Sequence, residues 1–121
     1  MKILVVEDNI MNRQLAGYLL RKGGIETAEV ESGEEALAWL ENNSAEIVLL
    51  DIQLPEIDGI EVLRRIRLNE NWRDMTVIAL TAYSMQGDKE RFEAVGFDGY
   101  ISKPIDSKSF VQSILQVNCQ Q

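Results

Sequence analysis

Histidine is absent from this sequence of 121 residues, and cysteine occurs only once. Without histidine, the chain cannot itself supply an imidazole as a general base, a nucleophile or a metal ligand. The single thiol, Cys119, has no partner for a disulfide within the chain, and this usage is typical of a reducing compartment. We therefore expect a cytoplasmic location and a mechanism in which any histidine comes from another molecule.

Long apolar runs and an excess of basic residues are also missing. No apolar run approaches the roughly 20 residues that a membrane-spanning helix requires. Acidic side chains number 20 against 12 basic ones, which leaves a net charge of −8. Because nucleic acids and anionic lipids carry charge of the same sign, we expect no direct binding to nucleic acid or to membranes.

What the sequence does contain is a set of short, continuous apolar runs. They lie at 3–6, 27–30, 47–50, 77–80 and 100–102. Runs of this length without alternation are typical of parallel strands that are covered on both faces. The length of the chain and its 45% of apolar residues fit one domain over residues 1–121.

Helical periodicity fills the intervals between these runs. In the first interval, four apolar residues fall on one helical face, and we expect them to pack inward. They are Met11, Leu15, Tyr18 and Leu19. Glycines 23–24 are expected to end this helix, as glycine often does after a last helical turn.

The later helices have recognisable starts. Ser32, with Glu35 three residues further on, predicts a capping box, and Asp58 predicts the cap of a third helix. A short fourth helix is predicted at about 86–94 and a last one from near Asp106. Their predicted inward residues are Ala36, Leu37, Leu40, Ile60, Leu63, Ile66, Phe110, Val111, Ile114 and Leu115. The alternation predicts an α/β fold with five helices and a doubly wound, five-stranded parallel sheet in the order 2-1-3-4-5.

Polar residues follow four of the five apolar runs. They are Glu7, Asp8, Asp51, Thr81 and Lys103. In open parallel sheets, ligands bind at the carboxyl ends of the strands, beside the point where the strand order reverses. We therefore expect these five side chains to converge on one edge of the sheet.

Three carboxylates held so close together need a compensating charge. Two charges about 5 Å apart repel by roughly 3 kcal/mol at an effective dielectric constant near 20. Either one carboxylate takes a proton or a cation binds among them. Mg²⁺, with a few carboxylate ligands and water, fits better than Zn²⁺, because the chain has no histidine and its thiol is remote.

The same residues are suited to phosphoryl transfer. The carboxylate of Asp51 is ionised at neutral pH and can attack phosphorus directly to give an aspartyl-phosphate. Mg²⁺, the ammonium of Lys103 and the hydroxyl of Thr81 would each hold one phosphoryl oxygen. Since the chain has no histidine, the donor must be another protein or a small phosphodonor.

Four segments resemble the receiver domains of two-component response regulators. They read Val-Val-Glu-Asp-Asn (5–9), Leu-Leu-Asp-Ile-Gln-Leu-Pro-Glu-Ile-Asp-Gly (49–59), Ala-Leu-Thr-Ala (79–82) and Tyr-Ile-Ser-Lys-Pro-Ile (100–105). The resemblance covers essentially the whole chain. It implies a phosphorelay signalling switch and not an enzyme, with a sensor histidine kinase or a histidine phosphotransfer protein as donor and another protein as downstream target.

The resemblance also implies roles for single residues. Asp51 would be the phosphoacceptor, assisted by Thr81 and Lys103. The implied Mg²⁺ ligands are the carboxylates of Glu7, Asp8 and Asp51 and the backbone carbonyl of Gln53. The implied switch residues are Thr81 and Tyr100, and the residues implied to tune the phosphoryl lifetime are Gln53 and Tyr83. A cis peptide bond is expected before Pro104.

A narrower resemblance points to receivers attached to hybrid sensor kinases and to single-domain regulators. It lies in Asn9, Asn12, Arg13 and the segment 85–91.

Other functions share parts of this pattern. A haloacid-dehalogenase phosphatase also uses an aspartate and Mg²⁺, but it needs a second aspartate where this chain has Gln53. A flavodoxin-like FMN module shares the strand order, but its phosphate loop would not carry Glu7 and Asp8. A degenerate receiver that serves only as a docking module stays open as an alternative. Asp8 is also a candidate cap for the first helix.

Overall fold

The computed structural model describes residues 1–82 and 88–119. In these residues, five strands alternate with five helices: β1 (Lys2–Val6), α1 (Ile10–Lys22), β2 (Glu26–Val30), α2 (Gly33–Asn42), β3 (Ile47–Asp51), α3 (Gly59–Leu68), β4 (Thr76–Thr81), α4 (Asp88–Val95), β5 (Gly99–Ser102) and α5 (Phe110–Cys119). All neighbouring strands pair in parallel, in the order β2-β1-β3-β4-β5. The predicted fold class and strand order are confirmed.

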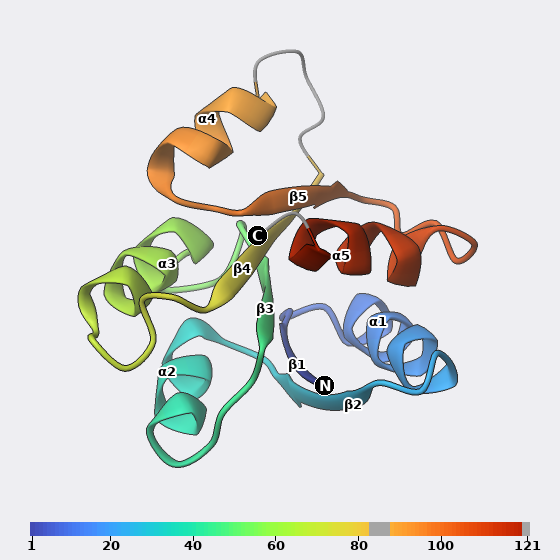
Figure 1. Cartoon of the computed structure of the whole chain (residues 1–121), viewed down its shortest axis with the longest axis horizontal. Coiled ribbons are helices and arrows are strands. Elements are labelled where there is room, and N and C mark those ends of the chain that lie inside the picture. Colours follow the sequence, from blue (N-terminus) through green and yellow to red (C-terminus); the bar gives the residue numbers. More distant parts are fainter. Residues whose placement is uncertain (83–87, 120–121) are drawn as a thin grey trace.

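Helices cover both faces of the sheet, with α2, α3 and α4 on one side and α1 and α5 on the other (Figure 1). Alternate residues of each strand therefore face different helices. Leu4 and Leu50 belong to the core beneath α2, α3 and α4, whereas Ile3 and Leu49 belong to the core beneath α1 and α5. Because both sides of the central strands are buried, apolar residues are required at every position, which explains the runs without alternation.

Side chains cap the first three helices. Asn9 accepts a hydrogen bond from the backbone N–H of Asn12 at 3.0 Å and is the N-cap of α1. Ser32 and Asp58 cap α2 and α3 as predicted, and Gly23 ends α1. Asp8, the other candidate cap for α1, is not the cap and lies one residue before it.

The predicted inward face of α1 is wrong for three of its four residues. Met11, Leu15 and Tyr18 are 77%, 37% and 57% exposed, and of the four only Leu19 is buried. The helix instead packs through Ala16, Gly17, Leu19 and Leu20. Two overlapping apolar stripes share Leu19, and the stripe with the smaller side chains lies against the sheet because it permits a closer approach of the backbones.

Two further details differ from the sequence-based expectations. Ile60, which was predicted to face inward, is 38% exposed. Val62 is buried in the core beneath α3 instead. The last helix begins at Phe110, four residues later than predicted, because residues around Asp106 form a turn. In that turn the Asp106 carboxylate accepts hydrogen bonds from the backbone N–H of Lys108 and the hydroxyl of Ser109.

Three other expectations concern single segments. The peptide bond between Lys103 and Pro104 is cis, as predicted. Helix α4 begins at Asp88, and the first two positions of the helix predicted at about 86–94 lie outside the described residues, as does Tyr83. No helix in the described part of the chain combines the length and apolarity needed to cross a membrane.

The loop between β3 and α3 holds one residue in an unfavourable backbone conformation. Glu56 has a φ of 63°, in the left-handed region that favours glycine. We expect Glu56→Gly to raise the free energy of unfolding by about 0.5–1 kcal/mol, measured by urea denaturation. The matched change Glu41→Gly, on an exposed helical position of α2, should lower it instead; a decrease for both variants would contradict the prediction.

Candidate functional site

The predicted site residues meet at the carboxyl edge of the sheet. Glu7 follows the last residue of β1, Asp51 ends β3, Thr81 ends β4, and Lys103 follows β5. The strand register brings these ends level with one another, because Val6 pairs with Leu50, and Asp51 with Leu80. Segments that are far apart in the sequence therefore deliver charged side chains to one place.

Three carboxylates form the acidic part of the site. Glu7, Asp8 and Asp51 each offer a carboxylate oxygen, and these oxygens lie within 4.8 Å of one another. Glu7 and Asp51 are buried, whereas Asp8 is exposed. Two buried acids beside a third represent a concentration of negative charge that only a cation or a proton can balance.

Lys103 supplies one such cation. Its Nζ lies 2.9 Å from Asp51 Oδ2 and 3.1 Å from Glu7 Oε2. Burial by itself would lower the pKa of Lys103, but the hydrogen bond to Asp51 and the charges of Asp51 and Glu7 outweigh it and raise that pKa. Lys103 therefore stays protonated, and one positive charge faces three carboxylates.

The negative charge that Lys103 does not balance affects Glu7 most. Burial, together with hydrogen bonding to Asp51 and the charge of Asp51, raises the pKa of Glu7 from 4.5 to about 7, although Lys103 opposes this rise. Glu7 Oε2 is buried; it lies 3.1 Å from Lys103 Nζ as an ion pair, but the two atoms do not have hydrogen-bond geometry, and no described residue donates a hydrogen bond to it. A buried carboxylate oxygen without such a bond, beside two further carboxylates, fits a hard divalent cation with oxygen ligands.

Both carboxylate oxygens of Asp51 are held in place. Oδ1 accepts a hydrogen bond from the backbone N–H of Gln53 at 2.9 Å, and Oδ2 accepts one from Lys103. Gln53 thus lies directly beside Asp51, but the metal-binding role of its carbonyl stays a prediction. The backbone is also tightly packed here, since a Cβ on Gly59 would lie 2.3 Å from the Asp51 carbonyl oxygen.

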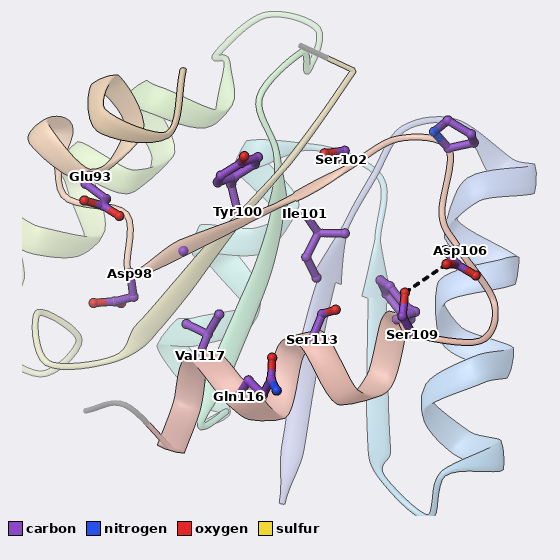
Figure 2. A pocket seen from close by; sticks show the side chains of 13 residues that line it. Glu93, Asp98, Tyr100, Ile101, Ser102, Asp106, Ser109, Ser113, Gln116 and Val117 are labelled. Carbon is purple, nitrogen blue, oxygen red and sulfur yellow. Dashed lines mark hydrogen bonds between the residues drawn. The ribbon is translucent and has the colours of Figure 1, made fainter. Parts of the chain in front are cut away.

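The two predicted switch residues occupy different surroundings. Thr81 is buried at the end of β4, and its carbonyl accepts a hydrogen bond from the Lys103 N–H at 2.7 Å. Tyr100 is half-buried on β5, and its ring centroid lies 6.1 Å from that of Phe92 on α4. Figure 2 shows Tyr100 and Ile101 on opposite sides of β5, with Ile101 toward α5. Their switching roles stay predictions.

One contact at this edge was missed by the sequence analysis. Arg13 Nη1 donates a hydrogen bond to the carbonyl oxygen of Glu7 at 2.9 Å. In the sequence, Arg13 contributed only to the resemblance to hybrid-kinase and single-domain receivers. A basic residue in the first turn of a helix, close behind an acidic pair, is the signal that could have marked it.

Known proteins resemble this chain in sequence and in fold. A model of the response regulator receiver domain matches residues 3–115. The polar-differentiation response regulator DivK of Brucella ovis is 41% identical over 112 residues, which make up 93% of this chain and 91% of DivK. The chemotaxis response regulator CheY4 of Vibrio cholerae is similar in structure, with a TM-score of 0.90 at 26% identity over 96% of this chain and 97% of CheY4.

A second solved structure is more similar in sequence. The receiver domain of sensor histidine kinase PA1611 from Pseudomonas aeruginosa is 37% identical, with a TM-score of 0.83 over 95% of this chain and 93% of that one. The family model, the curated relatives and the solved structures each cover more than nine-tenths of the chain. The chain therefore belongs to the response regulator receiver domain family.

Proposed function

We propose that this chain is a phosphorylation-dependent signalling switch in which Asp51 accepts a phosphoryl group in a reaction that requires Mg²⁺. The observation that carries the proposal is the charge arrangement at the sheet edge. Lys103 lies 2.9 Å from Asp51 Oδ2, while Glu7 and Asp8 bring their carboxylates within 4.8 Å of Asp51. An acceptor carboxylate beside a fixed cation and two metal-binding acids has the parts that phosphoryl transfer needs.

The acids support Mg²⁺ as the cofactor. Glu7, Asp8 and Asp51 would hold it, together with the backbone carbonyl of Gln53. The related receiver domain of PA1611 contains a magnesium ion coordinated in its active-site cleft, which supports the same ion here. When bound, Mg²⁺ supplies positive charge that offsets the negative charge of the phosphoryl group.

The transfer itself is a displacement at phosphorus. A carboxylate oxygen of Asp51 forms a P–O bond while the P–N bond to a phosphohistidine of the donor breaks and its electron pair returns to the imidazole nitrogen. A sensor histidine kinase or a histidine phosphotransfer protein is the expected donor, in the cytoplasm. Lys103 and Thr81 hold phosphoryl oxygens as charge develops, and the chain modifies itself and not a separate substrate.

Phosphorylation of Asp51 would alter the surface formed by α4, β5 and α5. This surface carries an open pocket of about 560 Å³ along the edge strand β5, lined by residues of α4, β5 and α5 (Figure 2). Tyr100 and Ser102 line it on β5, while Ser113 and Val117 line it on α5. Because Ser102 pairs with Thr81, a shift of Thr81 toward the phosphoryl group would reach this surface through β5, where a downstream protein target would bind.

Incubation with acetyl phosphate and Mg²⁺ tests the proposal. We expect the intact mass to rise by about 80 Da, as one acetate leaves and one phosphoryl group is retained. The gain should disappear when Mg²⁺ is removed with EDTA, and it should be absent from the Asp51→Asn variant. The Asp58→Asn variant, which changes an acid that caps α3 at the same side of the molecule, should still be phosphorylated.

The outcomes separate the proposal from its alternative. A gain that persists in Asp51→Asn would place the acceptor elsewhere. The absence of any gain, under conditions in which another receiver is phosphorylated, would favour a degenerate receiver that acts only as a docking module.

A further inference from the structure

The guanidinium of Arg13 contacts the backbone from which the metal-binding acids project. We propose that Arg13 is a positioning residue for the Mg²⁺ site, and that it acts by holding the main chain of Glu7. This inference rests on the proposed function, because it assigns Arg13 a task in that same site. Arg13 does not need to touch the metal or the phosphoryl group to do so.

The peptide units on either side of Glu7 are fixed by different parts of the fold. The N–H of Glu7 donates to the carbonyl of Val30 at the end of β2, at 3.2 Å. The carbonyl of Glu7 accepts the hydrogen bond from Arg13 Nη1 at 2.9 Å. The sheet therefore fixes the N–H side of Glu7, and the Arg13 side chain from α1 fixes its carbonyl side.

The position of the guanidinium is itself defined. The Arg13 side chain is only 11% exposed, and its Nη2 lies 3.5 Å from Glu31 Oε1. Its Nε lies 4.0 Å from Glu29 Oε1, and the Arg13 N–H donates to the Asn9 carbonyl at 2.9 Å. Arg13 thus ties the turn between β1 and α1 to the end of β2.

An arginine can make these contacts at the same time because its donors lie in a rigid plane. Nη1 points to the Glu7 carbonyl while Nη2 faces the carboxylate of Glu31 and Nε faces that of Glu29. Lysine would keep the positive charge but would lose the fixed geometry. Contacts behind metal ligands of this kind commonly change metal affinity by about 10- to 100-fold when they are removed.

An electrostatic role and a positioning role of Arg13 predict opposite effects of its replacement on the affinity for Mg²⁺, and this makes the inference testable. Loss of a positive charge near three carboxylates would, by electrostatics alone, strengthen the binding of Mg²⁺. Loss of the hydrogen bond to the Glu7 carbonyl would release the turn and weaken binding. The direction of the change therefore shows which role Arg13 has.

Arg21 provides a matched control on the same helix. It pairs with Glu29 at 2.8 Å, so it shares an ionic partner with Arg13. Eight residues separate the two arginines, which places Arg21 about 12 Å further along α1, away from Glu7. Arg21→Gln removes the same charge from the same helix and leaves the turn intact.

The experiment is a calorimetric titration of the metal-free protein with Mg²⁺ at constant ionic strength. We expect the dissociation constant to rise about 10-fold in Arg13→Gln, by a smaller factor in Arg13→Lys, and less than about twofold in Arg21→Gln. Urea denaturation of each metal-free variant records whether the variant is folded. If Arg13→Gln does not fold, Arg13→Lys carries the test.

Equal or tighter Mg²⁺ binding by the Arg13 variants, compared with the wild type, would overturn the inference while leaving the proposed function intact. If the wild type binds no Mg²⁺, the proposed metal site is wrong and the role of Arg13 falls with it. Weaker binding by both Arg13→Gln and Arg21→Gln, to the same degree, would also overturn it, because the effect would then follow the stability of α1 and not the contact with the Glu7 carbonyl.

Discussion

Replacing Lys103 with methionine is expected to lower the free energy of unfolding of the metal-free protein by about 2–3 kcal/mol near pH 8. The ammonium is the cation that faces Asp51 at 2.9 Å and Glu7 at 3.1 Å. Without it, buried carboxylates are left with no opposite charge, and breaking a buried pair on one side is more costly than losing a surface pair. We expect phosphoryl uptake to fall by at least about 100-fold, since a cation at the reacting oxygens is lost.

Urea denaturation over a range of pH measures this effect. The destabilisation should shrink near pH 5, because Glu7 is then protonated and one negative charge disappears. Mg²⁺ should restore part of the lost stability near pH 8, as it supplies the missing positive charge. Lys108→Met, at an exposed position five residues further on, should leave stability and phosphorylation unchanged. A Lys103→Met protein as stable as wild type near pH 8 without Mg²⁺ would show that Lys103 does not compensate the acids.

Replacing Glu7 with glutamine is expected to have the opposite effect on stability. The pKa of Glu7 is raised from 4.5 to about 7 in the folded protein, mainly because the side chain is buried. Between these two values the folded state retains a proton that the unfolded state has lost, so the free energy of unfolding falls as pH rises toward 7. Above pH 7 the penalty is fully present, and glutamine removes it.

We expect Glu7→Gln to raise the free energy of unfolding of the metal-free protein by about 2 kcal/mol near pH 8 and to change it little near pH 4.5. Its affinity for Mg²⁺ should fall at least about 10-fold, because a charged ligand is lost. Thermal denaturation in EDTA and calorimetric titration measure the two quantities. Glu41→Gln, on the exposed face of α2, is the control that should change neither. A Glu7→Gln protein that is less stable than wild type at high pH would show that the charged Glu7 does not destabilise the metal-free fold.

The two predictions share one cause, which is that the site gathers more negative charge than Lys103 can balance. In the metal-free protein near pH 8, the charged Glu7 is expected to weaken the fold, and Lys103 is expected to offset that weakness only in part. Natural proteins retain such destabilising groups where a ligand uses them. Under the proposed function, the acids of this site would favour the binding of Mg²⁺ before the phosphoryl group is transferred.

The sheet could be predicted from the sequence because each central strand is buried on both faces. Val48, Leu49 and Leu50 leave no polar position that would allow a solvated face, so the run itself indicates a covered parallel strand. The predicted strand order was then enough to place Asp51 and Lys103 near each other, because both lie at carboxyl ends of strands.

The orientation of α1 could not be predicted in the same way. Its larger apolar residues, such as Met11 and Tyr18, indicate one face, whereas the sheet contacts Ala16 and Leu20 on another. The choice depends on how closely the helix can approach β2. A Cβ on Gly17 would lie 2.3 Å from Glu29 Oε2, so the missing side chain makes room for that carboxylate. Such fit between distant residues is a property of the assembled structure and not of helical periodicity.

The contact between Arg13 and the Glu7 carbonyl was unpredictable for a related reason. Every residue has a backbone carbonyl, so the sequence does not show which carbonyl will accept a hydrogen bond. The direction of an arginine side chain depends in addition on the carboxylates around it. By contrast, the pairing of Lys103 with Asp51 needs only the strand order.

The separation of the site residues along the chain has a consequence for folding. Lys103 and Glu7 are 96 residues apart, and Lys103 and Asp51 are 52 apart. Contacts between such distant residues form late, because the intervening chain must first be ordered. A partly folded chain in which the edge strand β5 has not yet docked presents Asp51 without its lysine. Under the proposed function, such a chain would hold the acceptor without the cation that faces it, so the site would be complete only after β5 has docked.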